Sequence, residues 1–180
     1  MSDQHIAIAA IRFGDGDHID DLLEIVARTL GARGCRVAGY LQRETPDGPG
    51  CCGVMYLEDI ACGARTRMSQ ALGAGARGCR LDPQALAEAA CRLQASIGPQ
   101  TGLVVLNRFG KGETDGHGFR SVIAQACELG VPVLTAVRET YRPFWEEFTG
   151  GVGALLPPDA EEVTRWALSA DSVRRSPHAA

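Results

Sequence analysis

The predicted fold of this chain is decided by the stretch Leu103-Val104-Val105-Leu106-Asn107-Arg108-Phe109-Gly110-Lys111-Gly112-Glu113. Its four leading apolar residues are typical of a strand that is buried on both faces. Residues 116–129 then have a helical pattern, and residues 131–135 form another apolar run. The stretch therefore predicts a strand–loop–helix–strand unit of an α/β sheet.

The loop of this unit, residues 107–113, is a candidate ligand site. In open α/β sheets, ligands bind at the carboxyl ends of the strands, and this loop follows such an end. It contains Lys111, the only lysine of the chain, since the other 17 of the 18 basic residues are Arg. A lysine between two glycines could direct its charge at a bound anion. The alternative is an ordinary turn with a solvated lysine.

Length and composition predict one globular domain, residues 1–170, with a disordered tail at 171–180. No apolar run approaches the 18 residues that span a membrane. The chain opens directly on a strand-like run, so we expect no signal peptide and a cytoplasmic location. The net charge of −4, with arginines and acids interspersed, argues against a nucleic-acid surface.

The chain has seven cysteines, an odd number, and no CxxC pair. In a cytosolic protein this predicts no structural disulfides. Cys51, Cys52 and Cys62 could form a soft-metal cluster, but adjacent cysteines are poorly spaced for one tetrahedral ion. Cys91 and Cys127 lie in predicted helices, where we expect small core residues.

The N-terminal part also predicts a strand, a loop, a helix and a strand, at residues 5–11, 12–18, 19–33 and 36–42. Asp17 is the expected helix N-cap. Phosphate-binding domains open in the same way, and the Gly14 and Gly16 amides and Arg12 would face an anion there. A P-loop, however, needs GxxxxGK followed by Ser or Thr. This loop has neither the lysine nor the hydroxyl.

Four acids crowd the start of this first helix. They stabilise the positive end of the helix dipole and would repel a polyphosphate. We interpret them mainly as helix-stabilising residues, with Asp15 and Asp17 as the candidate metal ligands if the chain is a hydrolase. They are Asp15, Asp17, Asp20 and Asp21.

The middle of the chain predicts an antiparallel hairpin at 54–59 and 65–69 and a glycine-rich segment at 73–82. In that segment Arg77 and Arg80 could bind an oxyanion through their planar donors. The alternative is a flexible connection with solvated arginines. The fold that follows is a three-layer α/β domain with a mostly parallel sheet, helices on both faces and an appended hairpin.

Residues 138–148 are predicted to form an aromatic helix. A buried patch of Tyr141, Phe144, Trp145 and Phe148 could mediate formation of a homo-oligomer. The alternative is that these rings cover the sheet within one subunit.

With this order of elements, the sequence resembles a bacterial domain family of unknown function. Its members are often described as related to molybdenum transport or nitrogenase accessory genes. The matching stretches cover residues 77–82, 107–118 and 131–137. The resemblance implies a fold and a link to molybdenum metabolism, with molybdate or another oxyanion as a ligand.

A more distant likeness is to small nucleoside-triphosphatases of the thermophilic type, which have a P-loop fold. There the second phosphate-site strand ends in Asp-Glu, where this chain has Asn107 and Arg108, while Gly110 and Glu113 stay in register. The losses affect the groups that hold magnesium and the transferred phosphate. The resemblance thus implies a degenerate Walker A site.

Three functions stay open from sequence: binding of a small oxyanion without catalysis, nucleotide hydrolysis with magnesium, and protein interaction without a small ligand. Glu113 would be the water-activating base of a hydrolase. We favour oxyanion binding, with no cofactor assigned. Its predicted ligand-binding residues are Arg12, Gly14, Gly16, Arg77, Arg80, Asn107, Arg108 and Lys111.

Overall fold

A computed structural model describes residues 7–45, 53–70 and 81–175. Their helices and strands follow the predicted alternation. In chain order they are β1 Ile8–Phe13, α1 Ile19–Ala32, β2 Val37–Thr45, β3 Val54–Asp59, β4 Arg65–Arg67, α2 Pro83–Ser96, β5 Leu103–Val105, α3 Lys111–Thr114, α4 Arg120–Glu128, β6 Val133–Arg138, a 3₁₀ turn Glu139–Tyr141, α5 Arg142–Phe148, β7 Ala154–Leu156 and α6 Ala160–Arg175.

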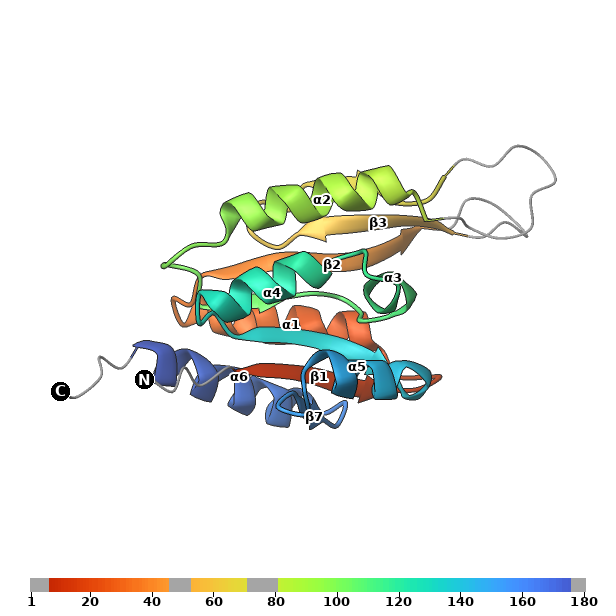
Figure 1. Ribbon diagram of the computed structural model, residues 1–180. Helices are drawn as coiled ribbons and strands as arrows, with labels where there is room; N and C mark the ends of the chain where they lie inside the picture. The colour runs from red at the N-terminus through yellow and green to blue at the C-terminus, as the bar shows by residue number, and fades with distance from the viewer. Residues whose placement is uncertain (1–6, 46–52, 71–80, 176–180) are drawn as a thin grey trace.

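The strands of the described chain form one sheet in the order β4-β3-β2-β5-β6-β1-β7 (Figure 1). The pairs β2–β5, β5–β6, β6–β1 and β1–β7 are parallel, whereas β3 runs antiparallel to both β2 and β4. This confirms the mostly parallel sheet with an appended hairpin. The central position of β5 explains why Leu103–Val105 is completely buried.

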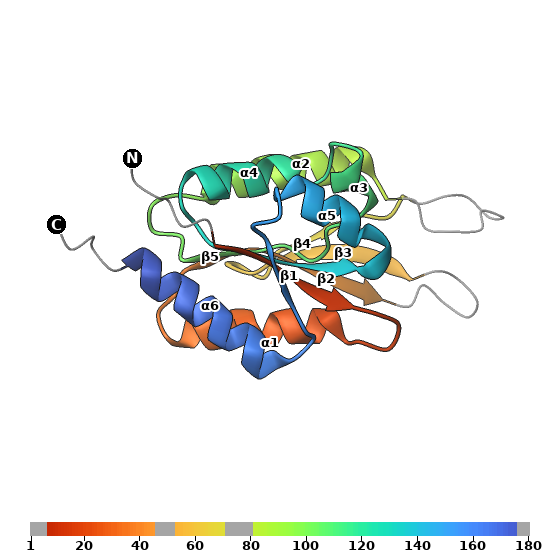
Figure 2. The same ribbon diagram turned by 60° about the horizontal axis from the view of Figure 1, so that its bottom comes forward.

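Helices cover both faces of the sheet, which gives three layers. α1 and α6 pack side by side on one face, and α2 and α4 lie on the other together with α3 and α5 (Figure 2). The strands alternate between two cores: Ile11 and Val105 face α1 and α6, whereas Ala10 and Val104 face the opposite layer. This alternation decides which side chains meet at the carboxyl edge.

Two predicted helix starts have different outcomes. Asp82 caps α2, as predicted. Its carboxylate accepts hydrogen bonds from the backbone amides of Gln84 and Ala85, and Pro83 is the first residue of the helix. Asp17, in contrast, does not cap α1. The N-cap residue is His18, without a side-chain cap, and Asp17 accepts the Gly14 amide at 2.7 Å inside the loop.

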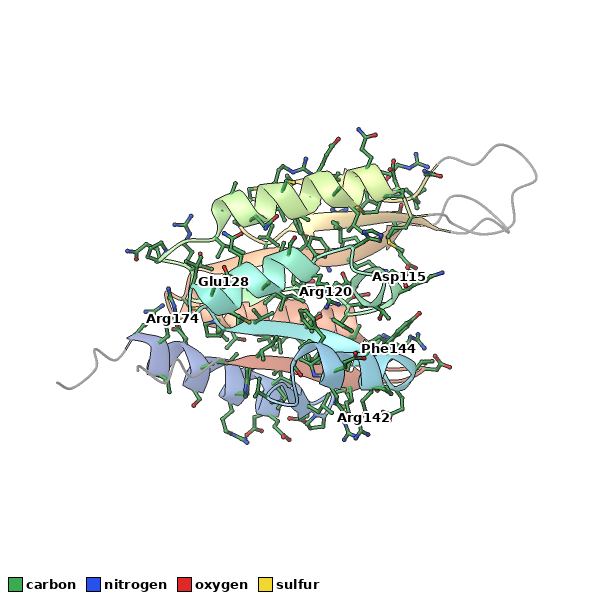
Figure 3. All side chains as sticks on the ribbon, in the orientation of Figure 1. Asp115, Arg120, Glu128, Arg142, Phe144 and Arg174 are labelled. Carbon is green, nitrogen blue, oxygen red and sulfur yellow. The ribbon has the colours of Figure 1, made fainter. Side chains whose placement is uncertain are left out.

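The predicted disordered tail begins too early. Residues 171–175 continue α6 because they are fastened to the body of the domain. Asp171 is buried and pairs with Arg175 at 2.9 Å, and Arg174 (labelled in Figure 3) donates to the Pro99 carbonyl at 2.6 Å. Residues 176–180 lie outside the described residues.

The helix expected at 116–129 begins later, at Arg120. Gly116 and Gly118 adopt φ angles of +87° and +64°, which an α-helix does not contain, so they separate the short α3 from α4. Elsewhere, Cys127 packs against the core as expected, but Cys91 is exposed on α2. Within the described ranges, none of the helices combines the length and the apolar character needed to cross a membrane.

Aromatic residues of α5 pack within the subunit. Trp145 is fully buried and meets Phe109 edge to face at a centroid distance of 5.4 Å, and Phe148 packs on Phe109 at 5.5 Å. The guanidinium carbon of Arg120 lies 4.6 Å from the centroid of the Phe148 ring. Phe144 stays exposed (Figure 3). The packing alternative therefore accounts for the fully buried Trp145 and for the contact of the partly buried Phe148 with Phe109.

Candidate functional site

Two arginines each contact the same aromatic ring at the carboxyl edge of the sheet. In the parallel register, Phe13 at the end of β1 stands beside Arg138 at the end of β6. The guanidinium carbons of Arg138 and Arg108 lie 5.1 Å and 5.4 Å from the centroid of the Phe13 ring. Such cation–π contacts hold a guanidinium plane in place without using its hydrogen-bond donors. Phe13 therefore gathers two cations whose donors are available to anions.

The first turn of α1 supplies the anion for one of these arginines. The Asp20 carboxylate accepts from Asn107 Nδ2 at 2.7 Å and pairs with Arg108 Nη2 at 3.3 Å. Asn107 is buried, with 6% of its surface exposed. Its hydrogen bond to Asp20 connects the start of α1 to the residues that follow β5. Asn107 Oδ1 and Arg108 Nε are buried without a hydrogen-bond partner among the described residues.

The loop between β1 and α1 supplies the anion for the other arginine. Asp15 pairs with Arg138 Nη1 at 2.7 Å, yet the Asp15 side chain is 95% exposed. The same loop is closed by the bond from the Gly14 amide to Asp17, so this amide is occupied. Gly16 has a φ of +92°, which a glycine adopts without strain. Asp15 is thus the least restrained member of the cluster.

The second loop, residues 107–119, is organised by a buried carboxylate. Glu113 Oε2 accepts the Gly110 amide at 3.0 Å and Oε1 accepts the Phe119 amide at 2.9 Å. A Cβ at Gly118 would overlap Glu113 Oε1. Burial raises the pKa of this carboxyl, and the amide hydrogen bonds oppose that rise. Because both of its oxygens hold the backbone, Glu113 has a structural role here.

The predicted ligand residues do not all converge. Asn107 and Arg108 lie in the cluster around Asp20. Arg12 is exposed and, by strand alternation, faces away from Phe13, toward the layer of α3 and α4. Lys111 is exposed on α3, which also belongs to that layer (Figure 2). Arg77 and Arg80 lie outside the described residues.

Three members of the cluster were not predicted as ligand-site residues: Phe13, Asp20 and Arg138. Arg138 carried a usable signal, since it directly follows the apolar run of β6 and parallel strands end at one edge. Asp20 was interpreted only as a helix-stabilising acid. Its pairing with Arg108 joins residues 88 positions apart, and no local pattern predicts such a contact.

Two solved structures have a fold similar to that of this chain. One is the crystal structure of THEP1 from the hyperthermophile Aquifex aeolicus, with a TM-score of 0.63, 14% identity, and coverage of 94% of this chain and 99% of that one. Another is the solution structure of a human cancer-related nucleoside triphosphatase, with a TM-score of 0.62 and 14% identity over 94% and 97% of the two chains. The chain thus has a P-loop-NTPase-like fold.

The first loop does not fit a magnesium polyphosphate. The pattern GxxxxGK[ST] is absent from this loop, and the first turn of α1 carries the acids Asp20 and Asp21 in place of a lysine and a hydroxyl. Asp20 is engaged by Asn107 and Arg108, which occupy the end of β5. Among the residues that the structure describes, no group of three or more His, Cys, Asp or Glu side chains could hold a metal ion.

One sequence relative has a name that refers to molybdenum import. Over 159 residues the chain is 38% identical to a Bradyrhizobium diazoefficiens protein named molybdenum import ATP-binding protein ModC 2. The match covers 88% of this chain but 18% of that relative. Residues 8–166 match the model of the family described as protein of unknown function (DUF2478), and the chain belongs to this family.

Proposed function

We propose that this domain binds a small tetrahedral oxyanion at the guanidinium groups of Arg108 and Arg138, in a role accessory to molybdenum metabolism. The observation that carries the proposal is the pair of guanidinium groups held over the Phe13 ring at the carboxyl edge. Molybdate is the first candidate because of the name of the Bradyrhizobium relative.

The aspartates of the first loop are the physical objection to an anion here. For Asp15 the objection is weak, because a carboxylate that is 95% exposed can leave Arg138 at little cost in free energy. An oxyanion would then take the place of the Asp15 carboxylate beside Arg138. Asp20 stays, so Arg108 contributes only the donors that Asp20 does not use. Each charge-assisted hydrogen bond then contributes about 1.5–3 kcal/mol.

Isothermal titration calorimetry with molybdate, tungstate, sulfate and phosphate tests the proposal. Arg108→Ala and Arg138→Ala should each weaken binding by roughly tenfold to a hundredfold, as expected for one lost charge-assisted bond. Arg165→Ala is the matched control, since this exposed arginine pairs only with Glu161 on α6. No binding by the wild type, or binding that neither variant weakens, would refute the site.

A hydrolase has less support from the geometry, although the solved structures with this fold are nucleoside-triphosphatases. The candidate base Glu113 has both oxygens bonded to backbone amides, and the candidate metal ligands Asp15 and Asp17 contact Arg138 and Gly14. Release of phosphate from ATP or GTP by the purified domain, lost in Glu113→Gln but not in Arg165→Ala, would favour hydrolysis instead.

A further inference from the structure

We propose that Asp20 determines specificity by restricting this site to a single tetrahedral oxyanion and excluding polyphosphates. The inference rests on the proposed function, because it concerns the same guanidinium pair. It starts from the disagreement between the fold and the charges: the first turn of α1 holds the acids Asp20 and Asp21, and Arg108 stands beside Asn107 after the end of β5.

The Asp20 carboxylate is held in place from two sides. Asn107 Nδ2 donates to Oδ1 at 2.7 Å, and Arg108 Nη2 meets Oδ2 at 3.3 Å. Asn107 is itself buried, and its Oδ1 is a buried oxygen without a hydrogen-bond partner among the described residues. The negative charge at the start of α1 therefore cannot turn away when a second anion arrives.

Asp15 differs from Asp20 in this respect. Its side chain is almost fully exposed, its one described partner is Arg138, and it stands on a loop between two glycines. A ligand with one tetrahedral group needs only the place that Asp15 gives up. A di- or triphosphate extends further, and along α1 it would meet Asp20 and then Asp21 at close range, where like charges repel strongly.

The ion pair between Asp20 and Arg108 also explains why an acid that excludes polyphosphates does not weaken the fold. In a P-loop, a helix lysine and strand-end acids hold the ligand and its magnesium. Here the helix carries the acid and the strand end carries the base, so the two groups neutralise each other without any ligand. The arrangement keeps the start of α1 attached to the residues after β5, and it engages the Arg108 guanidinium with Asp20 before a second or third phosphate could reach it.

The test measures binding of phosphate, pyrophosphate and tripolyphosphate to wild type and Asp20→Asn by calorimetry at fixed ionic strength. Asparagine has nearly the same shape and keeps one oxygen that can accept from Asn107 Nδ2, so the fold should persist. Circular dichroism checks whether Asp20→Asn folds; if it does not, Asp20→Ser is used in its place. Asp21→Asn is the matched control, because it removes the same charge one residue later from an exposed side chain without a described contact.

We expect the wild type to bind tripolyphosphate at least tenfold more weakly than phosphate. Asp20→Asn should raise tripolyphosphate affinity roughly tenfold, with little change for phosphate and a smaller change in Asp21→Asn. Equal affinities of the wild type for the two ligands, or equal gains in both variants, would overturn the inference. A wild type that binds no oxyanion while Asp20→Asn binds tripolyphosphate would refute the proposed function but support the role of Asp20.

Discussion

The two loops at the carboxyl edge of the sheet are held by different kinds of contact. Residues 14–21, after β1, are held by two side-chain ion pairs: Asp20 with Arg108, whose side chains are about one third exposed, and Asp15 with Arg138, of which Asp15 is almost fully exposed. Residues 107–119, after β5, are held by a buried carboxylate that accepts two backbone amides.

This difference indicates which loop can respond to a ligand. Exposed ion pairs contribute little to stability and exchange easily with other ions. A buried carboxylate bonded to amides leaves orphaned donors when it moves, which is costly. We therefore expect the second loop to be a fixed platform for Asn107 and Arg108, and the first loop, apart from Asp20, to adjust around a bound anion.

The largest expected effect is on the fixed loop. Glu113→Ala should lower the free energy of unfolding by about 2–3 kcal/mol, because the amides of Gly110 and Phe119 lose their acceptor. Urea unfolding followed by circular dichroism measures this change. Glu161→Ala is a suitable control, since that glutamate is exposed on α6 and makes only a surface pair with Arg165. A loss no larger than that of the control would mean that Glu113 does not hold the loop.

A smaller loss should follow from a methyl group at Gly118. Gly118→Ala combines a positive φ with overlap of the new Cβ and Glu113 Oε1, and should cost about 2 kcal/mol. Gly116→Ala is the matched control: its φ is also positive, but no atom lies within 4 Å of the new Cβ, so it should cost only about 1 kcal/mol. Thermal unfolding separates the two. Equal losses of stability in the two variants would show that the Glu113 side chain moves away from the new methyl group at little cost.

The smallest effects should come from the first loop. Asp20→Ala should cost about 1–2 kcal/mol, since it leaves the buried Asn107 amide without its acceptor. Asp15→Ala should leave the free energy of unfolding unchanged within error, as expected for an exposed ion pair. Urea titrations of both variants provide the measurement. A large loss in Asp15→Ala would contradict the view that this carboxylate leaves Arg138 easily.

Local patterns were sufficient for most of the fold. The apolar run at 103–106, the Asp82-Pro83 start of α2 and the hairpin at 54–67 each carry a signal within a few residues, because strand period, capping and turn chemistry are local properties. The same reasoning predicted a site at the carboxyl edge that includes Asn107 and Arg108, the two predicted residues that contact Asp20. It missed the extension of α6 to Arg175, which depends on contacts with Pro99 and Gly34 far along the chain.

The sequence by itself thus determined the alternation of elements, the absence of a GxxxxGK[ST] pattern after the first strand, and the edge at which charged residues gather. The tertiary structure alone decided which charges meet. Register between β1 and β6 places Arg138 beside Phe13, strand alternation sends Arg12 to the opposite face, and packing of α1 beside β5 brings Asp20 to Asn107 and Arg108. Such pairings depend on distances between elements, which a one-dimensional pattern does not contain.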